Sequence, residues 1–155
     1  MRLPQARTTL SCRDVVGSQD TPGPGFSVAF NRVALPTAKT LGGVRLHAGP
    51  QGGKFWAKQG LLITAGAAFE LIVPTAWVAR LSIGWGNPAG PSSQVDVSGC
   101  QATTPGTRWL AFAGGFWVSQ PACVPLIVRI ANRQRLVHIG VGAACSGQSP
   151  PPTSA

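Results

Sequence analysis

The feature that most constrains the fold is the way glycine and proline divide the chain into short apolar runs. The 155 residues include 20 glycines and 14 prolines, which are spread along the chain and form no single low-complexity block. Residues 26–32 (FSVAFNR) and 80–85 (RLSIGW) alternate between apolar and polar side chains, the period of a half-buried strand. We therefore expect an all-β, single-domain β-sandwich of about nine to ten short strands, with a small barrel as the alternative.

The turn-forming cluster DTPGPG at positions 20–25 marks the expected start of the folded domain. We expect a lead-in segment at 1–25, the β-sandwich at 26–145 and a disordered tail rich in proline and serine at 146–155. The lead-in has arginines but no apolar stretch of the signal-peptide kind. Residues 60–79 are apolar but are interrupted by charge, glycine and proline, so we expect strands there and no membrane span.

Residues 109–120 predict a β-hairpin at the centre of the fold. Two apolar runs, WLAFA and FWVSQ, flank Gly114-Gly115, and such a pair supplies the positive φ angles of a two-residue turn. In that register Phe112 faces Trp117 across the hairpin.

A second hairpin is expected from residues 124–131 and 134–140, with Asn132-Arg133 as its turn. That turn places Val128 opposite Val137 and makes their side of the hairpin the core side.

The four cysteines, Cys12, Cys100, Cys123 and Cys145, are widely spaced and none is in a CxxC pair. Zinc sites usually draw their ligands in close pairs, so we expect two disulfides and an oxidising compartment, with no metal or other cofactor. Three pairings are open, and four buried thiols are the alternative. We favour Cys100–Cys123 beside the first hairpin and Cys12–Cys145 between the domain ends, each contributing roughly 3–5 kcal/mol on the loop-entropy model.

The chain is strongly basic, with 13 Lys and Arg against 4 acidic residues and a net charge of +9. Such a surface attracts polyanions, whether nucleic acid, anionic lipid headgroups or acidic wall polymers. The basic residues are scattered except for Arg129, Arg133 and Arg135, which with His138 form our candidate anionic-ligand patch. The alternative is a solvated surface that simply lacks acids. Nucleic acid is disfavoured as a partner because no recognition motif occurs and the expected disulfides argue against a cytosolic role.

No catalytic motif occurs, neither a GxSxG elbow nor a phosphate-binding loop nor a dinucleotide fingerprint. A hydrolase that uses two carboxylates would need them to converge, and Glu70 and Asp96, each in a predicted strand, are the candidates. Pairing of each carboxylate with an arginine, or simple exposure to solvent, explains these acids equally well. We therefore expect no catalytic residue.

The five tryptophans, and the lysines on either side of Phe55-Trp56, raise the further idea of a carbohydrate-binding surface. Packing of most tryptophans in the core is the simpler interpretation.

Three stretches, FELIVPTAWVARLSIGWGNP, WLAFAGGFWVSQPACVPLIVR and HIGVGAAC, resemble a group of small uncharacterised extracytoplasmic proteins of actinobacteria. The resemblance covers most of residues 12–145. It implies an envelope-associated protein, exported or tethered through an N-terminal segment, and it carries over no catalytic residues.

These observations predict a non-enzymatic, extracytoplasmic binding or structural module of the cell envelope with a cationic surface. Its expected partner is an anionic envelope polymer or a protein, and its expected location is extracellular or on the envelope. The alternatives are an envelope hydrolase using Glu70 or Asp96 and a nucleic-acid-binding protein.

Overall fold

The computed structural model describes residues 7–23, 25–36, 44, 46, 48–51, 53–87, 89–102 and 107–148. Over this part of the chain the regular structure is almost entirely β, as the sequence predicts, with fourteen strands where about nine to ten were expected. The strands are β1 (Arg7–Thr9), β2 (Val15–Gln19), β3 (Ser27–Ala29), β4 (Val33–Leu35), β5 (Ala48–Gln51), β6 (Lys54–Lys58), β7 (Leu61–Thr64), β8 (Ala68–Ile72), β9 (Leu81–Trp85), β10 (Gln94–Ser98), β11 (Trp109–Phe112), β12 (Gly114–Val118), β13 (Ala122–Ile130) and β14 (Arg133–Val141). Two single-turn 3-10 helices, η1 (Cys12–Asp14) and η2 (Thr75–Trp77), complete the set.

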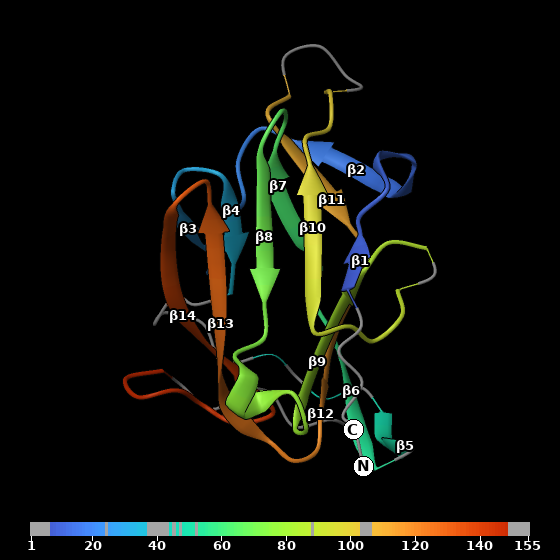
Figure 1. The fold of residues 1–155 in the computed structure, drawn as a ribbon, viewed down its shortest axis with the longest axis vertical. Coiled ribbons are helices and arrows are strands. Elements are labelled where there is room, and N and C mark those ends of the chain that lie inside the picture. The colour runs from blue at the N-terminus through green and yellow to red at the C-terminus, as the bar shows by residue number, and fades with distance from the viewer. Residues whose placement is uncertain are drawn as a thin grey trace.

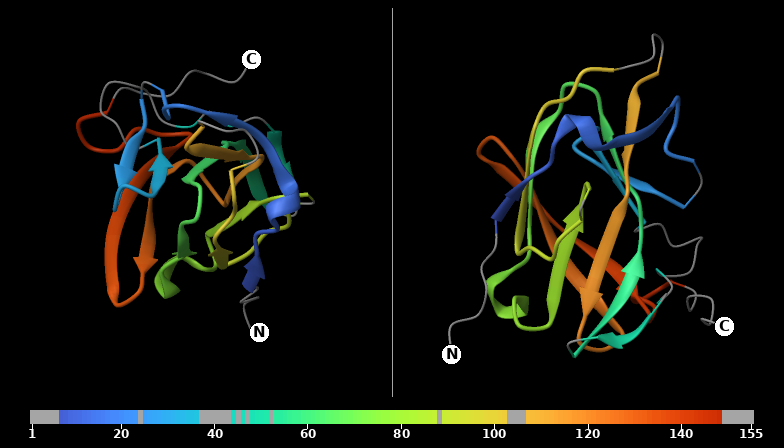
Figure 2. Two further views of the ribbon diagram at one scale, coloured as in Figure 1. Left: turned by 90° about the horizontal axis from the view of Figure 1, so that it is seen from above. Right: turned by 90° about the vertical axis from the view of Figure 1, so that its right-hand side faces the viewer.

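The strands form three sheets, which we call A, B and C. Sheet A has the order β1-β10-β8-β13-β14, sheet B the order β2-β11-β7-β4-β3, and sheet C the order β5-β6-β12-β9. In Figure 1, β8, β10 and β13 of sheet A lie in front of β7 and β4 of sheet B, while β9, β12 and β6 of sheet C lie below. Figure 2 shows the same layers from above and from the side.

The core lies between sheets A and B and continues under sheet C. Strand alternation produces it: β8 and β10 each bury every second side chain, which leaves the intervening polar ones outside. The largest fully buried side chains include Leu35, Leu61, Ile63, Leu71, Leu81, Ile83, Leu110, Phe112, Phe116, Leu126 and Ile139. Among the described residues, no helix has the length and apolar character needed to cross a bilayer.

The predicted hairpin at 109–120 is wrong. β11 pairs with β2 and β7 in sheet B, whereas β12 pairs with β6 and β9 in sheet C, so the chain changes sheet at Ala113. Gly114 and Gly115 are needed for close packing instead of for a turn. A Cβ at Gly114 would collide with the Gly84 carbonyl oxygen, and one at Gly115 with the Ala57 carbonyl oxygen.

The second predicted hairpin is confirmed as β13–β14, with its register displaced. Ile130 pairs with Arg133 and Val128 with Arg135, so the turn is Ala131-Asn132, and Ala131 takes a left-handed φ of 54°. Because the displacement is an even number of residues, each side chain keeps its predicted face of the sheet.

The predicted strand at 26–32 is shorter than expected and ends early. β3 stops at Ala29, and Phe30 and Asn31 adopt left-handed φ angles of 54° and 57° in the turn to β4. Arg32 closes this turn by donating its backbone N–H to the Ala29 carbonyl oxygen at 2.9 Å. Val28, on the apolar side of this alternating run, pairs with Ala34 on the opposite face of sheet B from Ala29 and is 37% exposed.

The described part of the lead-in segment contributes strands to the sandwich, because β1 pairs in parallel with β10 and β2 pairs with β11. The first six residues and the tail from residue 149 onward lie outside the described residues, as do Arg45 and His47. Of residues 44–46 the structure therefore describes Val44 and Leu46, and Val44 forms a single parallel bridge to Val141.

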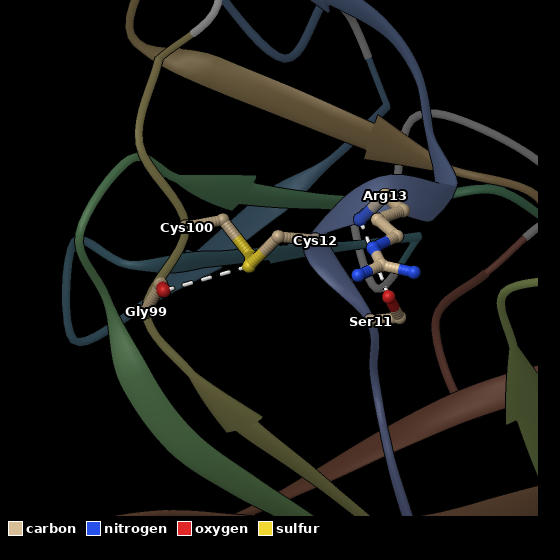
Figure 3. Close-up of a disulfide and its surroundings, with 5 residues drawn as sticks. All are labelled: Ser11, Cys12, Arg13, Gly99 and Cys100. Carbon is tan, nitrogen blue, oxygen red and sulfur yellow. Dashed lines mark hydrogen bonds between the residues drawn. A yellow bond between two sulfur atoms is a disulfide. The ribbon is translucent and has the colours of Figure 1, made fainter.

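Two disulfides are present, as predicted, and they indicate an oxidising, extracellular compartment. The predicted pairing is wrong, since Cys12 joins Cys100 (Figure 3) and Cys123 joins Cys145. Parallel pairing of β1 with β10 carries Cys12 to the end of β10, where its Sγ lies 3.5 Å from the Gly99 carbonyl oxygen. The pairing Cys100–Cys123 depended on a hairpin that does not form.

Candidate functional site

The candidate anionic-ligand patch divides between the two faces of the β13–β14 hairpin. Arg129 points outward from sheet A, where it contacts Glu70 of β8, and the exposed His138 lies on the same outer face of the hairpin. Arg133 and Arg135 follow the inward alternation of β14 at its open end and contact Phe30 of the facing sheet. The three arginines therefore form no single stripe.

Arg133, Arg135 and Phe30 form what we call the Phe30 cluster. The guanidinium carbon of each arginine lies 4.9 Å from the centre of the Phe30 ring. The left-handed turn after β3, the edge strand of sheet B, carries the ring, and β14, the edge strand of sheet A, carries the arginines. A cation over an aromatic ring at an exposed position contributes about 0.5–1 kcal/mol. The cluster therefore holds two charged groups in place at the open edge of the sandwich.

No carboxylate among the described residues forms an ion pair with the Phe30 cluster. All four acidic residues of the chain lie in the described part. Glu70 and Asp96 are paired with Arg129 and Arg7, and Asp14 accepts the backbone N–H of Asn87 at 3.1 Å. Both arginines of the cluster are exposed, so their charge faces solvent.

The two carboxylates of the hydrolase hypothesis do converge. Glu70 and Asp96 are directly paired residues of β8 and β10 on the outer face of sheet A. Gln94 Nε2 donates to Glu70 Oε2 at 2.8 Å and to Asp96 Oδ1 at 2.9 Å. Both line a shallow surface hollow of about 380 Å³ together with Arg7 and Arg129.

The charges around these carboxylates oppose acid catalysis. The Arg129 guanidinium donates to Glu70 through Nη2 at 2.6 Å and Nε at 3.0 Å, and these hydrogen bonds lower the pKa of Glu70. Partial burial acts to raise the pKa of Asp96, but hydrogen bonds from Gln94 and from Arg7 Nε, at 2.5 Å, outweigh it, and the pKa is lowered. A general acid needs a raised pKa, so the arrangement suits an ion-pair network that ties β1, β8, β10 and β13 together.

Two of the five tryptophans, Trp85 and Trp109, are fully buried, fewer than the core interpretation predicts, and Trp77 is partly buried against the core. Trp85 donates its indole N–H to the Gln59 carbonyl oxygen at 2.8 Å. Trp56 and Trp117 are half-buried cross-strand neighbours in sheet C, with ring centres 4.4 Å apart. The sequence did not predict this pair, because the expected hairpin turned Trp117 toward Phe112.

No group of three or more His, Cys, Asp or Glu side chains among the described residues could hold a metal ion.

Comparison with known proteins adds no relative: no family model, no curated protein and no solved structure matches this chain.

Proposed function

We propose that this chain is an exported, non-enzymatic binding module that holds an anionic polymer of the cell envelope, with the Phe30 cluster at the centre of its contact surface. The observation that carries the proposal is that Arg133 and Arg135 are exposed, held against Phe30 and without a carboxylate partner among the described residues. The two disulfides and the net charge of +9 support an extracellular polyanion as the partner. The resemblance to actinobacterial proteins is the reason to choose wall polymers as probes.

Two features of the cluster favour anion binding. A guanidinium group matches the geometry of phosphate and carboxylate oxygens, and it is less strongly hydrated than an ammonium group. Stacking on Phe30 also limits the side-chain freedom of both arginines before any ligand arrives, so less entropy is lost on binding. An arginine already paired with a carboxylate, such as Arg129, would have to give up that partner first.

The alternative functions receive less support from the geometry. The convergence of Glu70 and Asp96 supports the hypothesis of an envelope hydrolase. However, the lowered pKa of both leaves no protonated carboxyl group at neutral pH to act as the general acid. A continuous stripe of Arg129, Arg133 and Arg135 would favour a nucleic-acid-binding surface, but these arginines lie on two faces.

The test compares binding of the protein to wall fragments that retain their anionic polymer and to the same fragments stripped of it. The unaltered protein should bind only the former and should be released as salt rises, because added ions screen the contact. The variant Arg133→Gln/Arg135→Gln should bind at least about tenfold more weakly, since it loses two charge-assisted contacts.

The control Arg13→Gln/Arg80→Gln removes the same charge from other exposed positions, and Arg80 also stacks on an aromatic ring, 3.8 Å from Trp77. It should bind like the unaltered protein. If both double variants bound the wall fragments equally weakly, net charge alone would explain the effect, and the assignment to this cluster would be overturned. Binding that ignores salt, or no binding to either fragment, would overturn the proposal itself.

A further inference from the structure

We propose that the space between β3 and β14 binds a free single-chain amphiphile, with its alkyl chain against the apolar wall and its anionic group on Arg135. The inference shares the anion-binding arginine with the proposed function and otherwise stands on separate residues. It assigns a small-molecule ligand in addition to the polymer.

The site is concave and apolar. Described residues enclose a cavity of about 220 Å³, lined by Ser27, Val28, Ala29, Leu35, Arg135 and Val137. Ala29 and Leu35 are buried on this face of sheet B, and Ser27, which pairs with Leu35, lies on the same face and is exposed. Ligand sites are characteristically hollows with mostly apolar walls and a few polar groups at defined points. This cavity therefore has the form of a site for an apolar chain.

The unequal lengths of the two edge strands explain why the cavity exists. β3 has three residues and ends where Phe30 turns left-handed, whereas β14 has nine residues and runs on past it. Both strands end their sheets, at the left of Figure 1, so within the described part of the chain no further strand closes the gap between them. The inward side chains of β14, Arg135 and Val137, consequently face the cavity instead of a fully packed partner strand.

The charge beside the cavity selects among apolar ligands. Arg135 lines the cavity and also stacks on Phe30, and Arg133 lies on the same ring. No described carboxylate pairs with either arginine. An alkyl chain with a terminal anion complements both the apolar wall and the cationic rim, whereas an uncharged chain uses only the wall and a short anion only the rim.

The experiment measures displacement of a fluorescent fatty-acid probe, dansyl-aminoundecanoic acid, by unlabelled competitors kept below their micelle concentrations. Decanoate should displace the probe at one site per chain. Decyl maltoside, which has a chain of similar length and no charge, and butyrate, which has the charge and only a short chain, should each be at least about tenfold weaker. Equal potency of decanoate and decyl maltoside, or no displaceable probe, would overturn the inference.

Two matched pairs of variants locate the site. Ser27→Trp places an indole on the same face of β3 as Ala29 and should abolish probe binding, whereas Val16→Trp, at a position 68% exposed on β2, should leave it unchanged. Arg135→Gln should weaken decanoate about tenfold and leave decyl maltoside unaffected, whereas Arg80→Gln should change neither. Near-ultraviolet circular dichroism checks that each variant is folded. If Ser27→Trp failed to fold, the smaller substitution Ser27→Phe would serve at the same position.

The wall-fragment assay separates this inference from the proposed function. Ser27→Trp should retain binding to anionic wall fragments while losing the probe. Binding of polymer without any binding of decanoate would overturn the inference alone. Binding of decanoate without polymer would overturn the proposed function and leave the small-molecule site standing. Probe binding that survives Ser27→Trp at full strength would place the ligand elsewhere and overturn the inference.

Discussion

Two ion-paired carboxylate side chains on the outer face of sheet A make the free energy of unfolding depend on pH. The folded pKa values of Glu70 and Asp96 lie below their ordinary values of 4.5 and 3.8. The folded state therefore binds these protons less readily than the unfolded state. The stabilisation is present above the ordinary values and is lost as the pH falls through the lowered ones.

We expect Glu70→Gln/Asp96→Asn to flatten the acid side of the stability profile. The free energy of unfolding, measured by denaturant titration at several pH values from about 3 to 7, should fall less steeply toward low pH in this variant than in the unaltered protein. Asp20→Asn, at the turn after β2 and outside the network, is the control. An unchanged profile in the double variant would show that the ion pairs do not contribute.

Gly115 is a residue at which any side chain is excluded by the neighbouring strand. Its Cβ would meet the Ala57 carbonyl oxygen within the sheet, and backbone cannot move aside as a flexible side chain can. We expect Gly115→Ala to lower the free energy of unfolding by about 3 kcal/mol or more. Gly17→Ala, where a Cβ meets nothing within 4 Å, should leave the free energy of unfolding unchanged or raise it by up to about 1 kcal/mol. Similar values for the two variants would contradict the close packing of β12 against β6.

At the scale of the strands, sequence patterns predict pairings between segments close in the sequence and fail for pairings between distant segments. The β13–β14 hairpin was predictable because both strands and their turn lie within 20 residues, 122–141. The supposed hairpin at 109–120 failed because β11 and β12 pair with β2, β7, β6 and β9, none adjacent in the sequence. A Gly-Gly pair between apolar runs looks the same whether it forms a turn or permits close approach of strands.

The same limit applies to the candidate site. Charge counting singled out Arg133 and Arg135. The predicted register put Arg133 in the turn and Arg135 on the core side of the hairpin. Their contact with Phe30 joins the edges of two sheets, and it depends on left-handed angles at Phe30 that the alternating run FSVAFNR conceals. The convergence of Glu70 with Asp96 likewise depends on the register between β8 and β10.

The two disulfides close loops of different length, so their removal should lower the free energy of unfolding by different amounts. Cys12–Cys100 spans 88 residues and Cys123–Cys145 spans 22, and the two loops do not overlap. On the loop-entropy model the bonds contribute about 4.6 and about 3.4 kcal/mol. We expect Cys12→Ser/Cys100→Ser to lower the free energy of unfolding by more than Cys123→Ser/Cys145→Ser, in chemical denaturation without reductant. The reverse order would show that strain or residual structure outweighs loop entropy.

At the scale of the whole molecule, composition and alternation were enough to predict an all-β, disulfide-containing chain. Alternating polar and apolar side chains leave one face of each strand to be buried, and two such sheets bury each other. The number of strands was underestimated because several strands have only three residues, too short for an alternating pattern to be visible. The pairing of the cysteines depends on the final arrangement of the sheets and could not be read from spacing.

Disulfide connectivity is the measurement that tests the account most directly, because both the fold and the extracellular location depend on it. Trypsin, which cleaves after lysine and arginine, places each cysteine in a separate peptide: 8–13, 81–108, 109–129 and 136–155. Mass spectrometry of unreduced protein from its native cells should find peptide 8–13 joined to 81–108 and peptide 109–129 joined to 136–155. Links between 81–108 and 109–129, or four free thiols, would contradict the account.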